Sequence, residues 1–193
     1  MRRILLISLL FFTFSGIAQD KPLTEPVLTA TFLEPGIAYE FPVGYKSTIK
    51  ARAAITATIA TEEYGENKVR LFPRPLIGMS YRKYYNFERR EDNRLNTKRN
   101  SANYIGVIFL YATKPFNFNK KSELIGNNQY SYYDITRTLL NTGVVWGIQR
   151  NYNSRFSLDL NLGAGYVESG NVQGLSFIGE FTLGFWLNKR RDE

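Results

Sequence analysis

The sequence predicts an all-β protein, an antiparallel up-and-down transmembrane β-barrel of eight strands. Two segments, 155–166 and 175–187, alternate residue by residue between bulky apolar and small or polar side chains. A period of two places each set on its own face of a β-strand, and an apolar outer face with a polar inner face is typical of membrane barrels. The 193 residues include 15 Gly, 13 Tyr and 14 Phe, as expected for a β-rich chain with aromatic girdles. An export signal at the N-terminus is the third observation.

The N-terminus has the features of a secretory signal peptide over residues 1–18. Two arginines open it, an apolar run follows over 4–14, and small residues at 16 and 18 occupy the positions that a signal peptidase reads. The apolar run falls short of the about 20 residues that a spanning helix needs, so we expect cleavage rather than a retained anchor. Residues 19–193 are then expected to form a single outer-membrane barrel domain, since each spanning strand needs roughly 9 to 11 residues plus its connection.

The first half of the mature chain contains three clear strand segments. Residues 33–41 alternate and end at a turn around Gly44. Residues 45–60 alternate strictly, with a light apolar face of Ile and Ala, and residues 69–86 form a longer strand after a polar loop. The whole chain yields seven clear segments, whereas bacterial barrels close with an even number. The eighth strand is either residues 23–32, which we favour, or part of the long segment 131–150, if that segment is more than one simple strand.

The second half contains four more strand segments. Residues 101–113 follow a charged connection over 87–100, and residues 131–150 follow a loop rich in Asn and Lys. Segments 155–166 and 175–187 then close the barrel. With a strand over 23–32, both termini and the turn around Gly44 would lie on the periplasmic side.

Two strands carry irregular features. Pro73 and Pro75 cannot donate to a β-ladder, so the start of the strand over 69–86 is predicted to project beyond the membrane or to bulge. Ile108 and Leu110 blur the alternation of the strand over 101–113.

Composition limits the chemistry. The chain has no cysteine and no histidine, which excludes disulfides, thiolate sites and the usual general base and metal ligand near neutral pH. We therefore expect no catalytic, cofactor-binding or metal-binding residues, and no enzyme activity. The formal charge of +8 includes two arginines of the leader. The basic residues are spread over strands and loops, which favours lipid phosphates or an ion network over nucleic acid as their partner.

The inner face of the predicted barrel collects ten charged residues. An eight-stranded interior is just wide enough to be filled by side chains, so these groups are expected to pair and to plug the lumen. Asp159 and Glu180 are expected to neutralise arginines of earlier strands, notably Arg52, Arg74 and Arg82. The alternative is a narrow polar or anion-favouring pore. The candidate lumenal ion network comprises Glu34, Glu40, Lys50, Arg52, Arg70, Arg74, Arg82, Arg137, Asp159 and Glu180.

A basic run over 81–99 allows two interpretations. Arginine matches phosphate oxygens and tyrosine anchors at membrane interfaces, which suggests lipid binding. A solvated loop is the interpretation that we favour from the sequence. On the periplasmic side this connection would not meet lipopolysaccharide at the cell surface.

Three short motifs carry a resemblance to a protein family. Arg82-Lys83-Tyr84-Tyr85-Asn86, Arg89-Arg90 and Asn100-Ser101-Ala102-Asn103-Tyr104 resemble a group of small, uncharacterised Gram-negative outer-membrane β-barrel proteins. Residues 35–40 are similar to the first strong strand of that group. The resemblance implies fold and location, and it brings no catalytic residues. Outer-membrane barrel enzymes look different, because their active sites depend on histidine.

The expected function is that of a small outer-membrane barrel with a plugged lumen and a structural or interaction role. We expect a monomer that is surrounded by outer-membrane lipid, is inserted by the barrel-assembly machinery and binds no nucleic acid. A protein partner is not predicted. A soluble lipocalin-like barrel that binds an apolar ligand is a further alternative. The alternation of apolar and polar residues would be the same if the apolar face lined the interior and the polar face met water.

Overall fold

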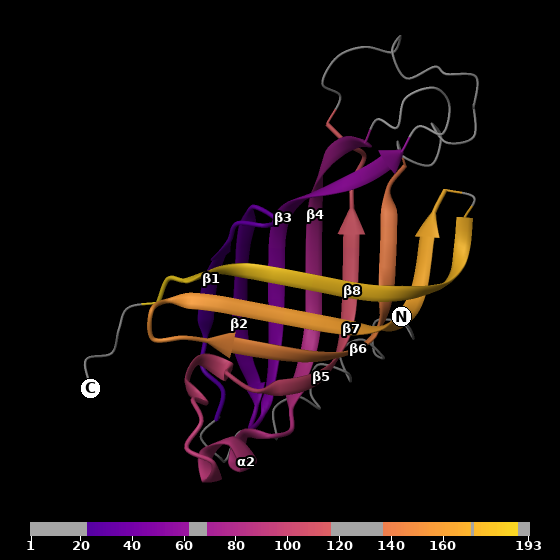
Figure 1. The fold of residues 1–193 in the computed structure, drawn as a ribbon. Coiled ribbons are helices and arrows are strands. Elements are labelled where there is room, and N and C mark those ends of the chain that lie inside the picture. The colour runs from indigo at the N-terminus through magenta and orange to yellow at the C-terminus, as the bar shows by residue number, and fades with distance from the viewer. Residues whose placement is uncertain (1–22, 62–68, 117–136, 171, 189–193) are drawn as a thin grey trace, which may run out of the picture.

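The chain forms a closed ring of eight antiparallel strands in sequence order, with β8 returning to β1 (Figure 1). The computed structural model describes residues 23–61, 69–116, 137–170 and 172–188. The predicted fold class, an all-β antiparallel up-and-down barrel of eight strands, is confirmed. The predicted signal peptide, residues 1–18, lies outside the described residues. The strands are β1 Val27–Thr31, β2 Gly36–Gly44, β3 Ser47–Thr61, β4 Val69–Tyr84, β5 Asn103–Ala112, β6 Leu139–Asn151, β7 Phe156–Ser169 and β8 Val172–Trp186.

Several strand ends differ from the prediction. β2 begins three residues later than predicted because residues 32–35 form the turn that joins it to β1. In that turn, Thr31 Oγ1 donates to the carbonyl oxygen of Glu34 at 2.5 Å. β7 and β8 are longer than predicted and approach each other at Ser169 and Val172. The predicted strand residues 131–136 lie outside the described residues.

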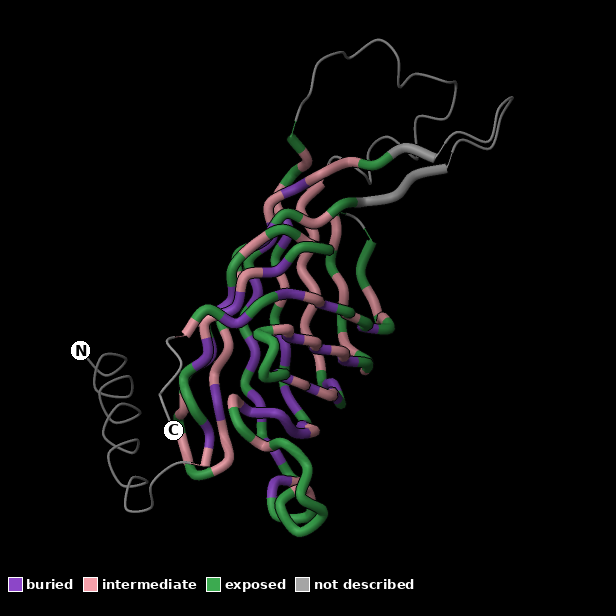
Figure 2. The backbone as a smooth tube through the Cα atoms, turned by 60° about the vertical axis from the view of Figure 1, so that its left-hand side comes forward, coloured by how far each residue is buried: buried purple, intermediate pink, exposed green. Residues whose placement is uncertain are grey.

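The strand residues alternate between an outer and an inner face (Figure 2). Large apolar side chains are exposed on the outer face, where Leu175 is 96 % and Phe177 is 72 % exposed. Ser157 and Asp159 are buried on the inner face of β7, and Ile108, whose phase was uncertain in the sequence, is also buried inside. The barrel is therefore apolar outside and largely polar inside.

The two prolines of β4 leave its pairing with β3 intact. The register runs without interruption through Pro73 and Pro75, so the predicted alternative of a bulge is wrong. Projection of this end beyond the membrane stays a prediction. Their carbonyl oxygens accept hydrogen bonds from the amides of Phe116 and Thr113. A residue's amide and carbonyl point to the same side of a strand, so each proline nitrogen faces residues 113–116, beyond the end of β5, and the prolines remove no donor from the pairing with β3.

The ring closes with a large stagger. Following hydrogen-bonded partners from Ala30 in β1 through each strand in turn leads to Gln173 in β8. Ala30 itself pairs with Phe185, twelve residues further along β8. Such a stagger tilts the strands strongly against the barrel axis. Only three residue pairs are registered between β1 and β8, with Thr31–Gly184 at one end.

One end of the barrel, which we call the α2 end, is covered by the connection between β4 and β5. This connection contains the short helix α2 (Phe87–Asp92) and the 3-10 turn η2 (Lys98–Asn100), and not only the predicted charged loop. In Figure 1 α2 lies beyond the strand ends. The strand directions place the start of β1, the β2–β3 turn, the β6–β7 turn and the end of β8 at the same end. No helix among the described residues is long and apolar enough to cross a membrane.

A small apolar core seals the α2 end. Phe87 packs against Tyr84, with ring centroids 5.3 Å apart, and Tyr84 packs against Tyr104 at 5.6 Å. All three side chains are at most 1 % exposed. Ala102, Ile108, Val145 and Ile178 complete this cluster.

Candidate functional site

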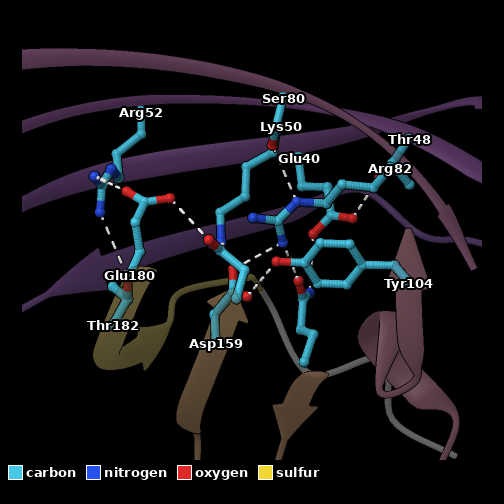
Figure 3. Close-up of polar contacts among 12 residues, drawn as sticks. Glu40, Thr48, Lys50, Arg52, Ser80, Arg82, Tyr104, Asp159, Glu180 and Thr182 are labelled. Carbon is cyan, nitrogen blue, oxygen red and sulfur yellow. Dashed lines mark hydrogen bonds and ion pairs between the residues drawn. The ribbon is translucent and has the colours of Figure 1, made fainter. Parts of the chain in front are cut away.

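A polar network of hydrogen bonds and ion pairs fills the interior of the barrel (Figure 3). Its side chains come from β2, β3, β4, β5, β6, β7 and β8, so that residues far apart in sequence meet at the barrel axis. Alternation puts these side chains inside, and the stagger of the strands brings them to the same height.

Asp159 is the centre of the first group of contacts. Its Oδ2 accepts from Lys50 Nζ and from Arg82 NH1, both at 2.7 Å, and its Oδ1 accepts from the hydroxyl of Tyr104 at 2.8 Å. The Arg82 guanidinium also lies over the Tyr104 ring, 4.3 Å from its centroid. Arg82 Nε donates to Ser80 Oγ at 3.0 Å. One carboxylate thus holds two cations in a buried site.

Glu40 is buried next to this group and has neutral partners. Its carboxylate accepts from Thr48 Oγ1 at 2.6 Å, from the Tyr84 hydroxyl at 2.6 Å and from Gln149 Nε2 at 2.9 Å. Gln149 Oε1 in turn accepts from Arg82 NH1 at 2.7 Å. Gln149 therefore links the Glu40 carboxylate to the Arg82–Asp159 pair.

Arg52 is the centre of the second group. It donates to Glu34 Oε2 at 2.9 Å, to Glu180 Oε1 at 2.5 Å and to Thr182 Oγ1 at 3.5 Å. Thr56 also donates to Glu34, at 2.7 Å. The Arg52 side chain spans the space between β3 and β8, two strands that do not pair with each other.

The structure brings together seven of the ten predicted network residues, in these two groups. Arg74 lies nearer the opposite end of the barrel, where its NH1 donates to the carbonyl oxygen of Arg137 at 3.2 Å. The Arg137 guanidinium packs against Gly170, so that a Cβ at Gly170 would overlap it. The side chain of Arg70 lies outside the described residues. The residues brought together are Glu34, Glu40, Lys50, Arg52, Arg82, Asp159 and Glu180.

Sequence reasoning missed the neutral members of the network. Tyr84, Tyr104 and Gln149 supply hydrogen bonds to the buried carboxylates. Each lies on the inward phase of its strand, so extending the alternation to uncharged polar side chains would have found them. Alternation does place Ser80, Asn161 and Thr182 on the polar faces, but the predicted network left them out, and it also left out Thr48.

A hollow of about 310 Å³, counted together with the solvent space at its mouth, lies between the two groups. Lys50, Arg52, Asp159 and Glu180 line its polar side, and Ile108 is among its apolar neighbours. Within the described residues no cluster of His, Cys, Asp or Glu could hold a metal ion. The arrangement consists of paired charges and fixed hydrogen bonds, which stabilise a packed polar interior.

The α2 end carries its own electrostatic contacts. Glu88 forms an ion pair with Lys46, and this hydrogen-bonded contact lowers the pKa of the exposed Glu88 carboxyl. The Arg99 guanidinium lies 3.8 Å from the centroid of the Trp186 ring. Asn100 adopts a left-handed conformation with φ of 61°, and its side chain accepts from the amide of Glu25 at 2.8 Å. These contacts fasten the connection between β4 and β5 across the barrel end.

Fold and site together define an eight-stranded β-barrel with an apolar exterior and a packed, charged interior. Comparison of the chain with protein-family models, with curated protein sequences and with solved structures finds no match. The resemblance to small outer-membrane barrels therefore rests on the three sequence motifs.

Proposed function

We propose that the protein is a small outer-membrane β-barrel with a plugged lumen and a structural or interaction role. One observation carries the proposal. Large apolar side chains are exposed all around the outer face, whereas charged side chains such as Arg82 and Asp159 are buried inside. This distribution is the inverse of a soluble protein and suits a hydrocarbon environment. Export through a cleaved signal peptide and a monomeric state are parts of the same proposal.

The inner face argues against a soluble barrel that binds an apolar ligand. Such a barrel needs an apolar cavity. Here the hollow between the two groups is lined by Lys50, Arg52, Asp159 and Glu180 among others. A soluble barrel would also expose Leu175 and Phe177 to water at a considerable free-energy cost.

The packing of the lumen supports a plug over a pore. Tyr84, Phe87 and Tyr104 are buried across the α2 end, and the Arg82–Asp159 pair lies directly behind them. A conducting path would need these contacts to open. We therefore propose that the charged interior has a structural role, and we assign no catalytic residue.

Membrane insertion of the mature chain tests the proposal. Residues 19–193 would be refolded in detergent micelles and mixed with liposomes, and flotation with the liposomes would be measured. Slower or faster gel migration of the unheated sample than of the heated one reports the folded barrel. We expect flotation, heat-dependent migration and no channels in planar bilayers in which a control porin conducts. A mature chain that is freely soluble and monomeric without detergent would overturn the proposal.

A further inference from the structure

A cluster of polar and aromatic side chains lies on the outer face at the α2 end. Trp146 Nε1 donates to the hydroxyl of Tyr85 at 2.7 Å. Asn103 Nδ2 approaches the same hydroxyl at 3.5 Å, and Arg150 NH2 donates to Asn103 Oδ1 at 2.7 Å. These four residues lie on the outward phase of β5 and β6 and just after β4. Tyr85 and Trp146 remain 48 % and 41 % exposed.

The connection between β4 and β5 adds a second arginine to this cluster. Arg90 of α2 donates through Nε and NH2 to the carbonyl oxygen of Asn96, at 3.2 and 3.0 Å. Asn96 Nδ2 donates at 2.6 Å to the carbonyl oxygen of Asn151, the residue that follows Arg150. These bonds dock Arg90, through Asn96, beside the end of β6 and next to the residue that follows Arg150.

The two arginines have only neutral partners among the described residues. Arg90 binds a main-chain carbonyl, and Arg150 binds the Asn103 amide and the carbonyl oxygen of Gln149 at 2.7 Å. Partial burial lowers the pKa of Arg90, and the nearby Tyr152 opposes this shift. Two like charges held on neighbouring segments repel each other, and an anion bound between them would relieve the repulsion.

The surroundings indicate which anion. Tyr85, Trp146 and Tyr152 are exposed at the level where the apolar outer face meets the polar barrel end. Tyrosine and tryptophan at such a boundary are typical of the membrane interface, where lipid headgroups lie. The arginine fork matches the oxygens of a phosphate group better than a lysine does.

We infer that Arg90 and Arg150 form a binding site for the phosphate of a phospholipid headgroup, with Tyr85, Trp146 and Tyr152 beside its glycerol and upper acyl chains. That the phosphate belongs to a lipid rests on the proposed membrane location, whereas the recognition of a phosphate group by the two arginines does not. The site lies at the α2 end, where β1 begins and β8 ends. In the proposed orientation it would meet the phospholipids of the periplasmic leaflet.

Native mass spectrometry in maltoside micelles tests this site. The probe is dioleoyl-phosphatidylglycerol, added to the folded barrel, and the wild type is expected to retain one lipid after the micelle is removed. The variant Arg90→Gln/Arg150→Gln is expected to bind it about tenfold more weakly or worse, because two charge-assisted contacts are lost. The matched control is Arg89→Gln/Arg94→Gln, which removes two exposed arginines of the same connection and is expected to bind as the wild type does.

Three further arms separate the possible outcomes. Heat-dependent gel migration checks that each variant is folded, and Arg90→Lys/Arg150→Lys keeps the charge while removing the fork, so intermediate binding is expected. Millimolar inorganic phosphate is expected to leave the lipid bound, and complete displacement would overturn the lipid as ligand. Equal lipid binding by the wild type and the glutamine pair, or equal loss in the control pair, would overturn the site. Because binding is measured in micelles, failed liposome insertion would be distinguished from failed lipid recognition.

Discussion

Arg82 NH1 donates to Asp159 Oδ2 at 2.7 Å, and the two side chains are only 4 % and 6 % exposed. Lys50 binds the same oxygen. A buried pair of this kind is sensitive to the loss of one member, because the remaining charge keeps its desolvation cost without its counter-ion. The interior of this barrel therefore depends strongly on one carboxylate.

Asp159→Asn tests that dependence while keeping the size of the side chain. We expect a loss of about 3 to 5 kcal/mol in the free energy of unfolding, because Lys50 and Arg82 lose their shared counter-ion. Urea unfolding in detergent micelles measures it. Asp92→Asn, at the exposed end of α2, is the control and should leave the midpoint unchanged. Equal midpoints for both variants would contradict the role of Asp159.

Glu180→Ala should lower the free energy of unfolding by less than Asp159→Asn does. Arg52 keeps Glu34 as a second partner, at 2.9 Å, so its charge is not left alone. We expect a lower folding yield than for Glu91→Ala, which removes an exposed carboxylate of α2. The yield is read from the heat-dependent band on gels. If the two alanine variants refold equally well, Glu180 does not help to close the barrel.

Gly147 provides a test of packing within the network. A Cβ at this position would overlap the ring of Tyr104, whereas a Cβ at Gly174 would meet no atom within 4 Å. Gly147→Ala should push Tyr104 away from Asp159 and destabilise the barrel by about 1 to 3 kcal/mol. Gly174→Ala is the matched control and should be nearly neutral. Unchanged near-ultraviolet circular dichroism and stability in Gly147→Ala would show that the ring has room to move.

Phe87 provides a test of the seal at the α2 end. Its side chain is 1 % exposed, so Phe87→Ala should cost about 3 to 5 kcal/mol through lost burial and a new cavity. Leu175→Ala removes an apolar side chain of the outer face that makes few contacts in the protein, and it should cost much less. Thermal unfolding in micelles compares the two. A larger effect of Leu175→Ala would mean that the outer face, and not the seal, limits stability.

The sequence allowed the face of most strand residues to be predicted, because alternation depends only on parity. It did not allow ion-pair partners to be assigned. Whether a residue is odd or even in its strand gives the face on which it lies, but not its level along the barrel axis. Lys50 and Asp159 are 109 positions apart, and they meet because of a twelve-residue stagger that no local pattern encodes. For the same reason the placement of Arg74 near Arg137 could not be predicted from its inward phase.

The seal at the α2 end was not predictable for a different reason. Phe87 follows a strand and begins a charged segment, so no periodicity marks it as buried. Phe87 is buried because the connection between β4 and β5 folds back over the barrel end. Hydrogen bonds of Asn100 and Asn151 hold the connection there. Arg150 was likewise overlooked, because its relation to Arg90 arises only when the connection folds back.

The short seam between β1 and β8 has a consequence for the biosynthesis of the protein. The contacts that close the ring join the first strand to the segment at the end of the last one: the amide of Leu28 donates to Asn188 Oδ1 across 160 positions. The pairings from β1–β2 to β6–β7 can form before β8 is made, but the β1–β8 pairing needs the end of β8. A chain cut short before Gly184 would keep seven strand interfaces and end as an open sheet with two unpaired edges, which are sites of aggregation. Closure of the ring thus depends on Gly184, Phe185 and Trp186 at the end of β8.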